Sequence, residues 1–211
     1  MIIAVDGPAA AGKGTLARAL AAHYGFHFLD TGSLYRMVGL AVLTSGADPR
    51  DPEAATAAAE RLNPQCFGAD SLRDEKVGQA ASIVAAIPSV RAALLDLQRA
   101  FAARKPGTVL DGRDIGTIVC PAAEAKIFVT ASPEERARRR TLELAERGET
   151  VAYAAVLADI HERDQRDRSR SFAPLVPAAD AFILDTSTLD IDASVAAAIR
   201  YVDSRVAKRS A

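Results

Sequence analysis

The chain has 211 residues, of which 49% are hydrophobic, and its formal net charge is −1. This length suits one α/β domain with its own core, and the balanced charge gives no basic field that would attract nucleic acid. Two cysteines without metal spacing, no apolar run of about 18 residues and no charged leader exclude a disulfide framework and a membrane span. We therefore expect a cytoplasmic protein.

Five short apolar runs predict buried parallel strands. They are Ile2–Val5, Phe26–Leu29, Thr108–Leu110, Lys126–Val129 and Ala181–Leu184. Helical patterns cover Lys13–His23, Ser33–Leu43, Asp51–Leu62, Glu75–Ile87, Ser89–Ala103, Pro133–Arg147, Val151–Arg168 and Asp192–Ala207. Strands that alternate with helices predict an α/β fold with a doubly wound, five-stranded parallel sheet. Ligands of such sheets gather at the carboxyl ends of the strands.

A glycine-rich segment links the first strand to the first helix. Its residues are Gly7, Pro8, Ala9, Ala10, Ala11, Gly12, Lys13, Gly14 and Thr15. This spacing is typical of a phosphate-binding loop, whose backbone N–H groups turn toward phosphate oxygens. Lys13 is expected to reach the outer phosphates of ATP, and Thr15 to offer a hydroxyl to Mg²⁺. Gly14 stands where Ser or Thr commonly follows the lysine, a spacing that resembles the nucleoside monophosphate kinases.

The stretch between the second and third strands contains no convincing core strand. We interpret residues 31–105 as a helical, substrate-binding subdomain within a single kinase domain over 1–211, with a loop at 63–74. Pro88 is expected to separate two of its helices, because proline ends one helix and can open the next.

Two polar clusters follow predicted strands. In the first, Thr31 and Arg36 lie at the start of a helix, where a hydroxyl, the helix N-terminus and an arginine can share an anion. The alternative is an ordinary helix cap followed by a surface arginine. In the second, Asp111 would orient Mg²⁺ or its water, and Arg113 would lie near the transferred phosphoryl group. The alternative there is a strand-end turn with an internal Asp–Arg pair.

A charged run extends from Glu162 to Arg170 within a predicted lid region over 145–170. In a helix, four of its side chains share one face, where they can close over an anionic substrate. These are Arg163, Arg166, Asp167 and Arg170. The alternative is a solvated helix stabilised by ion pairs. A second arginine group points around its helix, and we expect most of it at the surface; it comprises Arg136, Arg138, Arg139 and Arg140.

Together these segments resemble the bacterial cytidylate kinases over nearly the whole chain. The most specific marks are Asp111-Gly112-Arg113-Asp114 and the charged run followed by Ala173-Pro174-Leu175. The resemblance implies that Arg36 and Arg113 bind the CMP phosphate. It also implies that the cytosine is recognised by Ser82, Arg91 and Asp114. In the lid region, it implies contacts to the sugar, base or phosphate from Arg163, Asp167 and Arg170. Residues 63–74 are shorter than the segment that forms a small β-sheet in those kinases.

The resemblance implies transfer of the ATP γ-phosphate to CMP or dCMP, with Mg²⁺, as a step of pyrimidine metabolism. Lys13, Asp111, Arg113 and Arg163 are the expected catalytic residues, and the substrate phosphate oxygen is itself the nucleophile. The partners expected are these small molecules, with no nucleic acid or membrane, and the chain is expected to be a monomer. The alternatives are a kinase for UMP, AMP or shikimate, and a P-loop switch that senses nucleotide.

Overall fold

The structure is a computed structural model that describes residues 1–68, 71–72 and 74–210, without the side chains of 208–210. Two compact units make up the chain. One contains Met1–Leu29 and Ala102–Ala211, and the other contains Asp30–Phe101. The second unit covers most of the segment 31–105, which the sequence analysis interprets as a subdomain.

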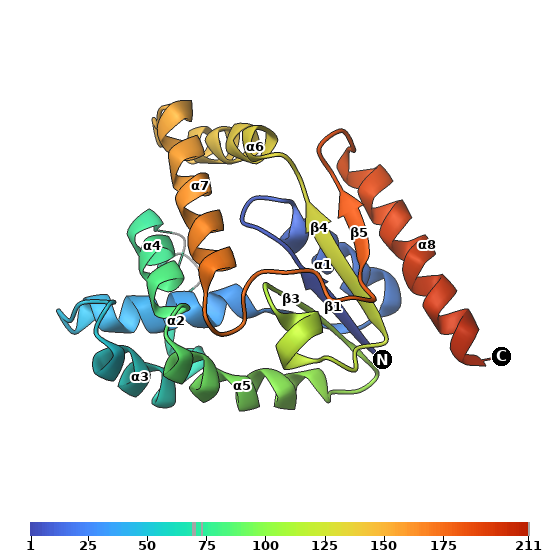
Figure 1. Ribbon diagram of the computed structural model, residues 1–211, viewed down its shortest axis with the longest axis horizontal. Coiled ribbons are helices and arrows are strands. Elements are labelled where there is room, and N and C mark those ends of the chain that lie inside the picture. Colours follow the sequence, from blue (N-terminus) through green and yellow to red (C-terminus); the bar gives the residue numbers. More distant parts are fainter. Residues whose placement is uncertain (69–70, 73, 211) are drawn as a thin grey trace. The chain divides into compact units, whose positions relative to one another are not determined.

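A five-stranded parallel sheet forms the centre of the fold (Figure 1), in the order β2-β3-β1-β4-β5. Its strands are β1 (Ile2–Asp6), β2 (His27–Asp30), β3 (Thr108–Gly112), β4 (Ala125–Thr130) and β5 (Phe182–Asp185). Because β1 pairs with both β3 and β4, its residues Ile3, Ala4 and Val5 are fully buried. The predicted α/β class and its five strands are confirmed, each strand within two residues of its expected bounds.

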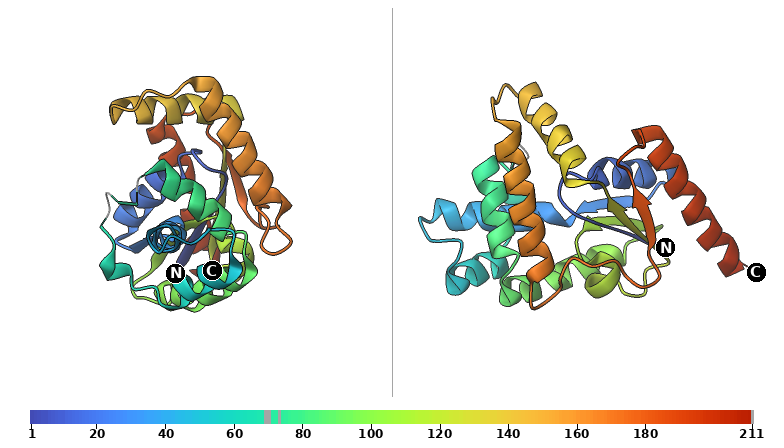
Figure 2. Two further views of the ribbon diagram at one scale, coloured as in Figure 1. Left: turned by 90° about the vertical axis from the view of Figure 1, so that its left-hand side faces the viewer. Right: turned by 45° about the horizontal axis from the view of Figure 1, so that its top comes forward.

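Helices α1 (Lys13–Tyr24) and α8 (Ile191–Ser210) pack against each other and against the sheet (Figure 2). The apolar side of α1 contributes Leu16 and Leu20, and α8 contributes Ala198 and Val202. Burial of such apolar area contributes about 25 cal/mol per Å². This packing fixes the first turn of α1, and with it the end of the glycine-rich segment.

Helices α6 (Pro133–Glu146) and α7 (Tyr153–Ser169) pack through a small apolar core. Ser132 caps α6 by accepting a hydrogen bond from the Glu135 amide at 3.2 Å. Gly148 ends it with a φ of 80°, while its own N–H and that of Glu149 bond the last carbonyls of the helix. This is a Schellman motif, which needs a left-handed residue and favours glycine.

The Asp30–Phe101 unit consists of helices in its described part. They are α2 (Thr31–Thr44), α3 (Pro52–Glu60), the short 3₁₀ helix η1 (Pro64–Cys66), α4 (Glu75–Val84) and α5 (Pro88–Ala102). Pro88 opens α5, as predicted. The predicted loop at 63–74 contains η1 and turns, while residues 69, 70 and 73 lie outside the described residues. The sequence analysis missed one further element, the π-helical turn η2 (Ile115–Val119) after β3.

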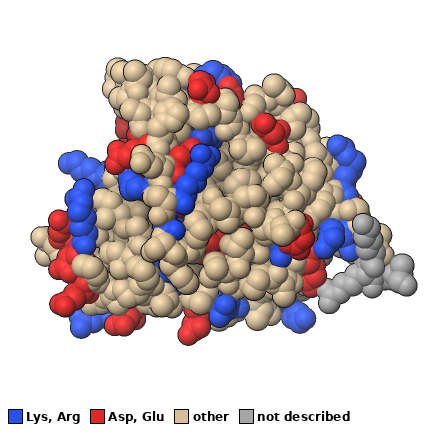
Figure 3. All heavy atoms as spheres, in the orientation of Figure 1, with Lys and Arg blue, Asp and Glu red and all other residues tan. Residues whose placement is uncertain are grey.

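Among the described residues, no single helix is both long and apolar enough to cross a membrane. Only α4 and α5 together reach the required length and hydropathy, and the chain bends by 99° between them. On the face drawn in Figure 3, basic and acidic side chains lie beside one another, in keeping with the net charge of −1.

The close approach of α2 and α4 generates a first prediction. A Cβ at Gly39 of α2 would lie 2.9 Å from the Ala81 amide nitrogen and 3.0 Å from the Ala80 Cβ. Gly39→Ala therefore forces the two helices apart, and we expect the unfolding free energy to fall by about 1–3 kcal/mol. Urea denaturation measures it. Thr44→Ala, at an exposed position of the same helix, is the control and should change stability by less than about 0.5 kcal/mol; equal effects would contradict the prediction.

Candidate active site

The segment from Gly7 to Thr15 forms a loop that returns the chain from β1 into α1. Gly7 has a φ of 146°, and a Cβ there would lie 1.9 Å from the Val129 carbonyl oxygen of β4. No side chain fits at this distance, so the glycine lets the loop pass directly over β4. Gly12 and Ala10 also have positive φ angles, of 85° and 58°. Ala10 is the more costly of the two, because a Cβ disfavours this region.

The carbonyl groups of the loop are bonded to side-chain donors. Lys13 Nζ donates to the Pro8 carbonyl at 2.7 Å, and Thr186 Oγ1 donates to the Ala11 carbonyl at 3.3 Å. In a trans peptide the N–H points opposite to the C=O. Bonds to the carbonyls therefore help to turn the loop amides the other way, as a phosphate cradle needs.

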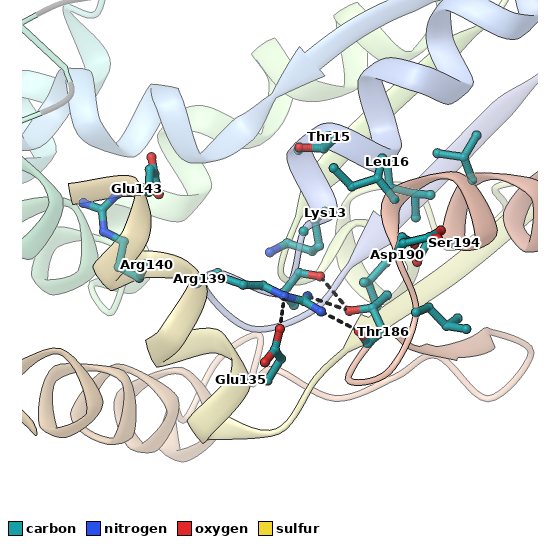
Figure 4. Close-up of a pocket in the computed structure, with 18 of the residues that line it drawn as sticks. Lys13, Thr15, Leu16, Glu135, Arg139, Arg140, Glu143, Thr186, Asp190 and Ser194 are labelled. Atoms are coloured by element: carbon teal, nitrogen blue, oxygen red, sulfur yellow. Dashed lines mark hydrogen bonds and ion pairs between the residues drawn. The ribbon is translucent and has the colours of Figure 1, made fainter. Parts of the chain in front are cut away.

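A cavity of about 870 Å³ opens beside the loop and the start of α1 (Figure 4). Arg139 of α6 extends across it in the close-up and meets Thr186, which follows β5. Its NH1 donates to Thr186 Oγ1 at 3.0 Å, and its Nε donates to Glu135 at 2.9 Å. A hydrogen bond from Arg138 lowers the pKa of the Glu135 carboxyl to about 2. The cavity thus has a fixed guanidinium and a loop of amides in its wall, which suits an anionic ligand.

The expectation that most of the α6 arginines lie at the surface is wrong. Only Arg138 is largely exposed, with 61% of its side chain accessible. Arg139 and Arg140 line the cavity, with side chains 27% and 18% exposed, and Arg136 is buried at 1%. Helical spacing does point these four side chains in different directions around the axis of α6. Because other parts of the protein cover α6 on several sides, the direction of a side chain does not by itself indicate its exposure.

Oxygen donors that suit a magnesium ion lie near the start of α1. Thr15 is exposed and lines the cavity. Asp111 at the end of β3 is buried, and its Oδ2 would lie 3.5 Å from a Cβ placed on Gly14. Hydroxyl and carboxylate oxygens are ligands that Mg²⁺ accepts, commonly together with substrate phosphates.

Three carboxyl groups gather where β1 and β3 end. Asp6 accepts hydrogen bonds from the amides of Ile115 and Gly116, both at 2.7 Å, and so holds the first turn of η2. Burial raises the pKa of Asp6 to about 7, with a further contribution from the charges of Asp114 and Asp111. Asp114 is itself buried at the N-terminus of η2. The position of the predicted Asp111–Asp114 cluster thus depends on Asp6.

The charged run of α7 contains both buried contacts and surface ion pairs. Arg113 Nε donates to Asp167 Oδ2 at 3.1 Å, and Asp167 also accepts from Arg170. The side chains of Asp167 and Arg170 are 7% and 4% exposed. Arg163 pairs with Asp159 and Arg166 pairs with Glu162, each one helical turn away. Ion pairs, as in the solvated-helix alternative, thus occur along α7, while Asp167 and Arg170 are buried; closure of this face over an anionic substrate stays a prediction.

The remaining predicted site residues belong to the Asp30–Phe101 unit. Asp30 caps α2 through the Ser33 amide, and Thr31 is buried behind it. Arg36 donates to the Leu72 carbonyl at 2.9 Å. Arg91 is buried, donates to the Ala85 carbonyl at 3.1 Å and lies over the Tyr35 ring. The hydroxyl oxygen of Ser82 is buried without a hydrogen-bond partner among the described residues, which marks it as available to a ligand.

Sequence reasoning missed four residues that shape this site. Asp6 directly follows the predicted strand Ile2–Val5 and belongs to no motif, and Asp164 lies within the charged run but not on its shared face. Arg139 and Thr186, which together close one side of the cavity, were given no role. Each of these residues contacts a segment that is distant in the sequence. No local residue spacing therefore identifies them.

A glycine-rich loop at the carboxyl ends of a parallel sheet defines the class of P-loop kinase-like proteins. Two solved structures share the fold of this chain. An uncharacterized protein from Eubacterium ventriosum matches with a TM-score of 0.55 and 15% identity, over 97% of this chain and 99% of its own. A gluconokinase from Sinorhizobium meliloti matches with a TM-score of 0.51 and 16% identity, over 99% and 94%. These likenesses show the fold alone.

The chain belongs to the cytidylate kinase family, whose pattern matches residues 3–204. The cytidylate kinase of Bradyrhizobium diazoefficiens is 58% identical over 210 residues, which are 100% of this chain and 99% of that protein. The cytidylate kinase of Nitrobacter winogradskyi is 60% identical over 204 residues, covering 97% and 96%. The family resemblance stated from the sequence is confirmed.

The raised pKa of Asp6 generates a second prediction. Its folded-state pKa of about 7 exceeds the ordinary value of 3.8. The protonated carboxyl therefore stabilises the fold fully below about pH 4, and this contribution declines as the pH rises to about 7, by up to about 1.4 kcal/mol per unit. Urea unfolding measures the unfolding free energy of the wild type and of Asp6→Asn from about pH 5 to 8. As the pH rises to about 7, the wild type should lose stability relative to Asp6→Asn, and above that pH the difference should stay constant. A difference independent of pH would contradict it.

Proposed function

We propose that this protein transfers the γ-phosphate of ATP to CMP or dCMP, giving ADP and CDP or dCDP. The match to the cytidylate kinase family over residues 3–204, with the phosphate-binding loop intact, carries the proposal. Relatives named cytidylate kinase further support it, since they are 57–60% identical to this chain and match it over nearly their whole length.

On the donor side, the loop amides and Lys13 would bind the ATP phosphates in the cavity beside α1. Lys13 bonds the Pro8 carbonyl in this structure, so ATP binding would exchange that bond for phosphate oxygens. Thr15 and Asp111 would hold Mg²⁺, directly or through water. The ion would supply positive charge that neutralises the phosphates during transfer.

On the acceptor side, Arg36 and Arg113 would bind the CMP phosphate and reduce its repulsion from ATP. Their positive charges favour the approach of two anions, and the substrate phosphate oxygen attacks without a covalent enzyme intermediate. The buried hydroxyl of Ser82 and the guanidinium of Arg91 would read the cytosine, together with Asp114. Segment 31–105 is thus proposed to bind CMP.

Residues 145–170, which contain the turn after α6 and the whole of α7, are proposed to act as a lid. Arg163, Asp167 and Arg170 would contact the substrates, and Arg163 would stabilise the transferred charge. A closed lid excludes water that would otherwise hydrolyse ATP. We further propose that the protein acts as a monomer.

A coupled assay with CMP, dCMP, UMP, AMP and GMP as acceptors tests this function. We expect the highest kcat/KM for CMP or dCMP. Lys13→Met should lower kcat by about 10²–10³, because one charge at the transferring phosphates is lost. Methionine is chosen because Lys13 is buried, so that the apolar stem of the side chain must be kept. ATP hydrolysis without transfer to any acceptor would instead favour a nucleotide-sensing switch.

Base selection provides a further prediction. The Asp114 carboxylate can accept from the cytosine amino group, whereas uracil presents a carbonyl oxygen that a carboxylate repels. In Asp114→Asn the amide can donate to uracil, so the CMP/UMP ratio of kcat/KM should narrow by about tenfold or more. Steady-state kinetics on both substrates measures it, with Asp48→Asn at the exposed Arg50 pair as the control. If both values fell together at a constant ratio, Asp114 would serve geometry rather than base recognition.

A further inference from the structure

Among the side chains that the structure describes, Arg136 is the most buried arginine, and its guanidinium joins three separate segments. Its Nε donates to the Ala131 carbonyl at 3.0 Å, in the turn between β4 and α6. Its NH1 donates to the Ala9 carbonyl of the phosphate-binding loop at 3.2 Å. Its NH1 and NH2 form a bidentate pair with Asp164 of α7, at 2.9 and 2.6 Å. The side chain is 1% exposed and that of Asp164 is 7% exposed.

A buried ion pair is weak evidence for stability, because desolvation offsets much of the attraction. Apolar side chains of similar volume can often replace the ion pair itself without loss of stability. They could not replace the two bonds from Arg136 to backbone carbonyls, at Ala131 and at Ala9, and only the one to Ala9 reaches the phosphate-binding loop. It matters because the next residue, Ala10, has a φ of 58°, a conformation that alanine rarely adopts.

The geometry of the peptide bond shows what this contact does. With the Ala9 carbonyl turned toward Arg136, the Ala10 N–H of the same trans peptide points to the opposite side. The Pro8 and Ala11 carbonyls have donors of their own, in Lys13 and Thr186. Arg136 therefore constrains the Ala9–Ala10 peptide, which directly precedes the left-handed Ala10.

We infer that Arg136 is a positioning residue for the donor phosphates, which orients the Ala9–Ala10 peptide, with Asp164 fixing the guanidinium. The inference rests on the proposed function, since it assigns the loop to the phosphates of ATP. Arg136 is not proposed to touch ATP itself, because its contact is with the loop backbone. Loss of the contact leaves the cavity in place but leaves the Ala10 amide without a fixed direction.

The decisive variant is the double substitution Arg136→Met with Asp164→Leu, which replaces the ion pair by apolar groups. If the pair only supports the fold, this protein should unfold near the wild-type temperature and bind ADP as the wild type does. If Arg136 positions the loop, the Kd for ADP and the KM for ATP should rise about tenfold or more, the effect of one hydrogen bond to a charged group. Titration calorimetry with ADP and steady-state kinetics measure these.

Arg136→Lys is the companion variant. It keeps a positive charge opposite Asp164, but a single ammonium cannot reach oxygens on three segments in the planar geometry of a guanidinium. We expect the same loss of ADP affinity. Arg50→Met, which breaks the exposed pair with Asp48, is the matched control and should bind ADP normally.

Each outcome decides the inference. Wild-type ADP affinity in a folded double variant, or in folded Arg136→Lys, overturns it. If neither protein shows a cooperative unfolding transition, Arg136 belongs to the fold itself and the inference is also overturned. A wild type that does not bind ADP or phosphorylate CMP would refute the proposed function instead, whereas an active wild type with unchanged variants refutes only the role of Arg136.

Discussion

A loop can surround a phosphate only if its peptide N–H groups converge, and this constraint governs the rest of the structure. The carbonyls must then point away, toward donors that replace water. Gly7 permits the first part by crossing the Val129 carbonyl at a distance that no side chain tolerates. Lys13, Thr186 and Arg136 satisfy the second by donating to the outward carbonyls. The loop is thus shaped as much by its surroundings as by its own glycines.

The order of the strands brings those surroundings together. Because β4 pairs with β1, the turn that follows β4 and the first turns of α6 lie beside the loop, and they carry Arg136. β5 pairs with β4 in turn, so Thr186 at its end reaches Ala11. On the other side of β1, β3 brings Asp111 close to Gly14. Parallel pairing therefore converts residues far apart in sequence into one site, as the carboxyl ends of such sheets generally do.

Most of the structure that could be predicted from the sequence was predicted from local residue patterns. The strands, the loop from Gly7 to Thr15 and the start of α5 at Pro88 depend on neighbours a few residues away, and the structure agrees with each. Burial of Arg136 depends on α7 and on the loop together, and the turn at Ile115–Val119 depends on the carboxylate of Asp6. No residue spacing within either segment reports such partners, so helical direction suggested a surface arginine, and the π-helical turn was not foreseen.

The hydroxyl of Ser82 has a consequence for the protein without ligand. A buried polar group that makes no hydrogen bond costs about 1–3 kcal/mol, and within the described part of the chain this oxygen makes none. Replacing it by a hydrogen atom would remove that cost, so an alanine here would give a more stable protein that lacks the hydroxyl proposed to bind the cytosine. Sequences selected or engineered for heat resistance alone would drift toward that alanine. Survival after heating is therefore a misleading screen for this enzyme unless nucleotide turnover is scored in the same experiment.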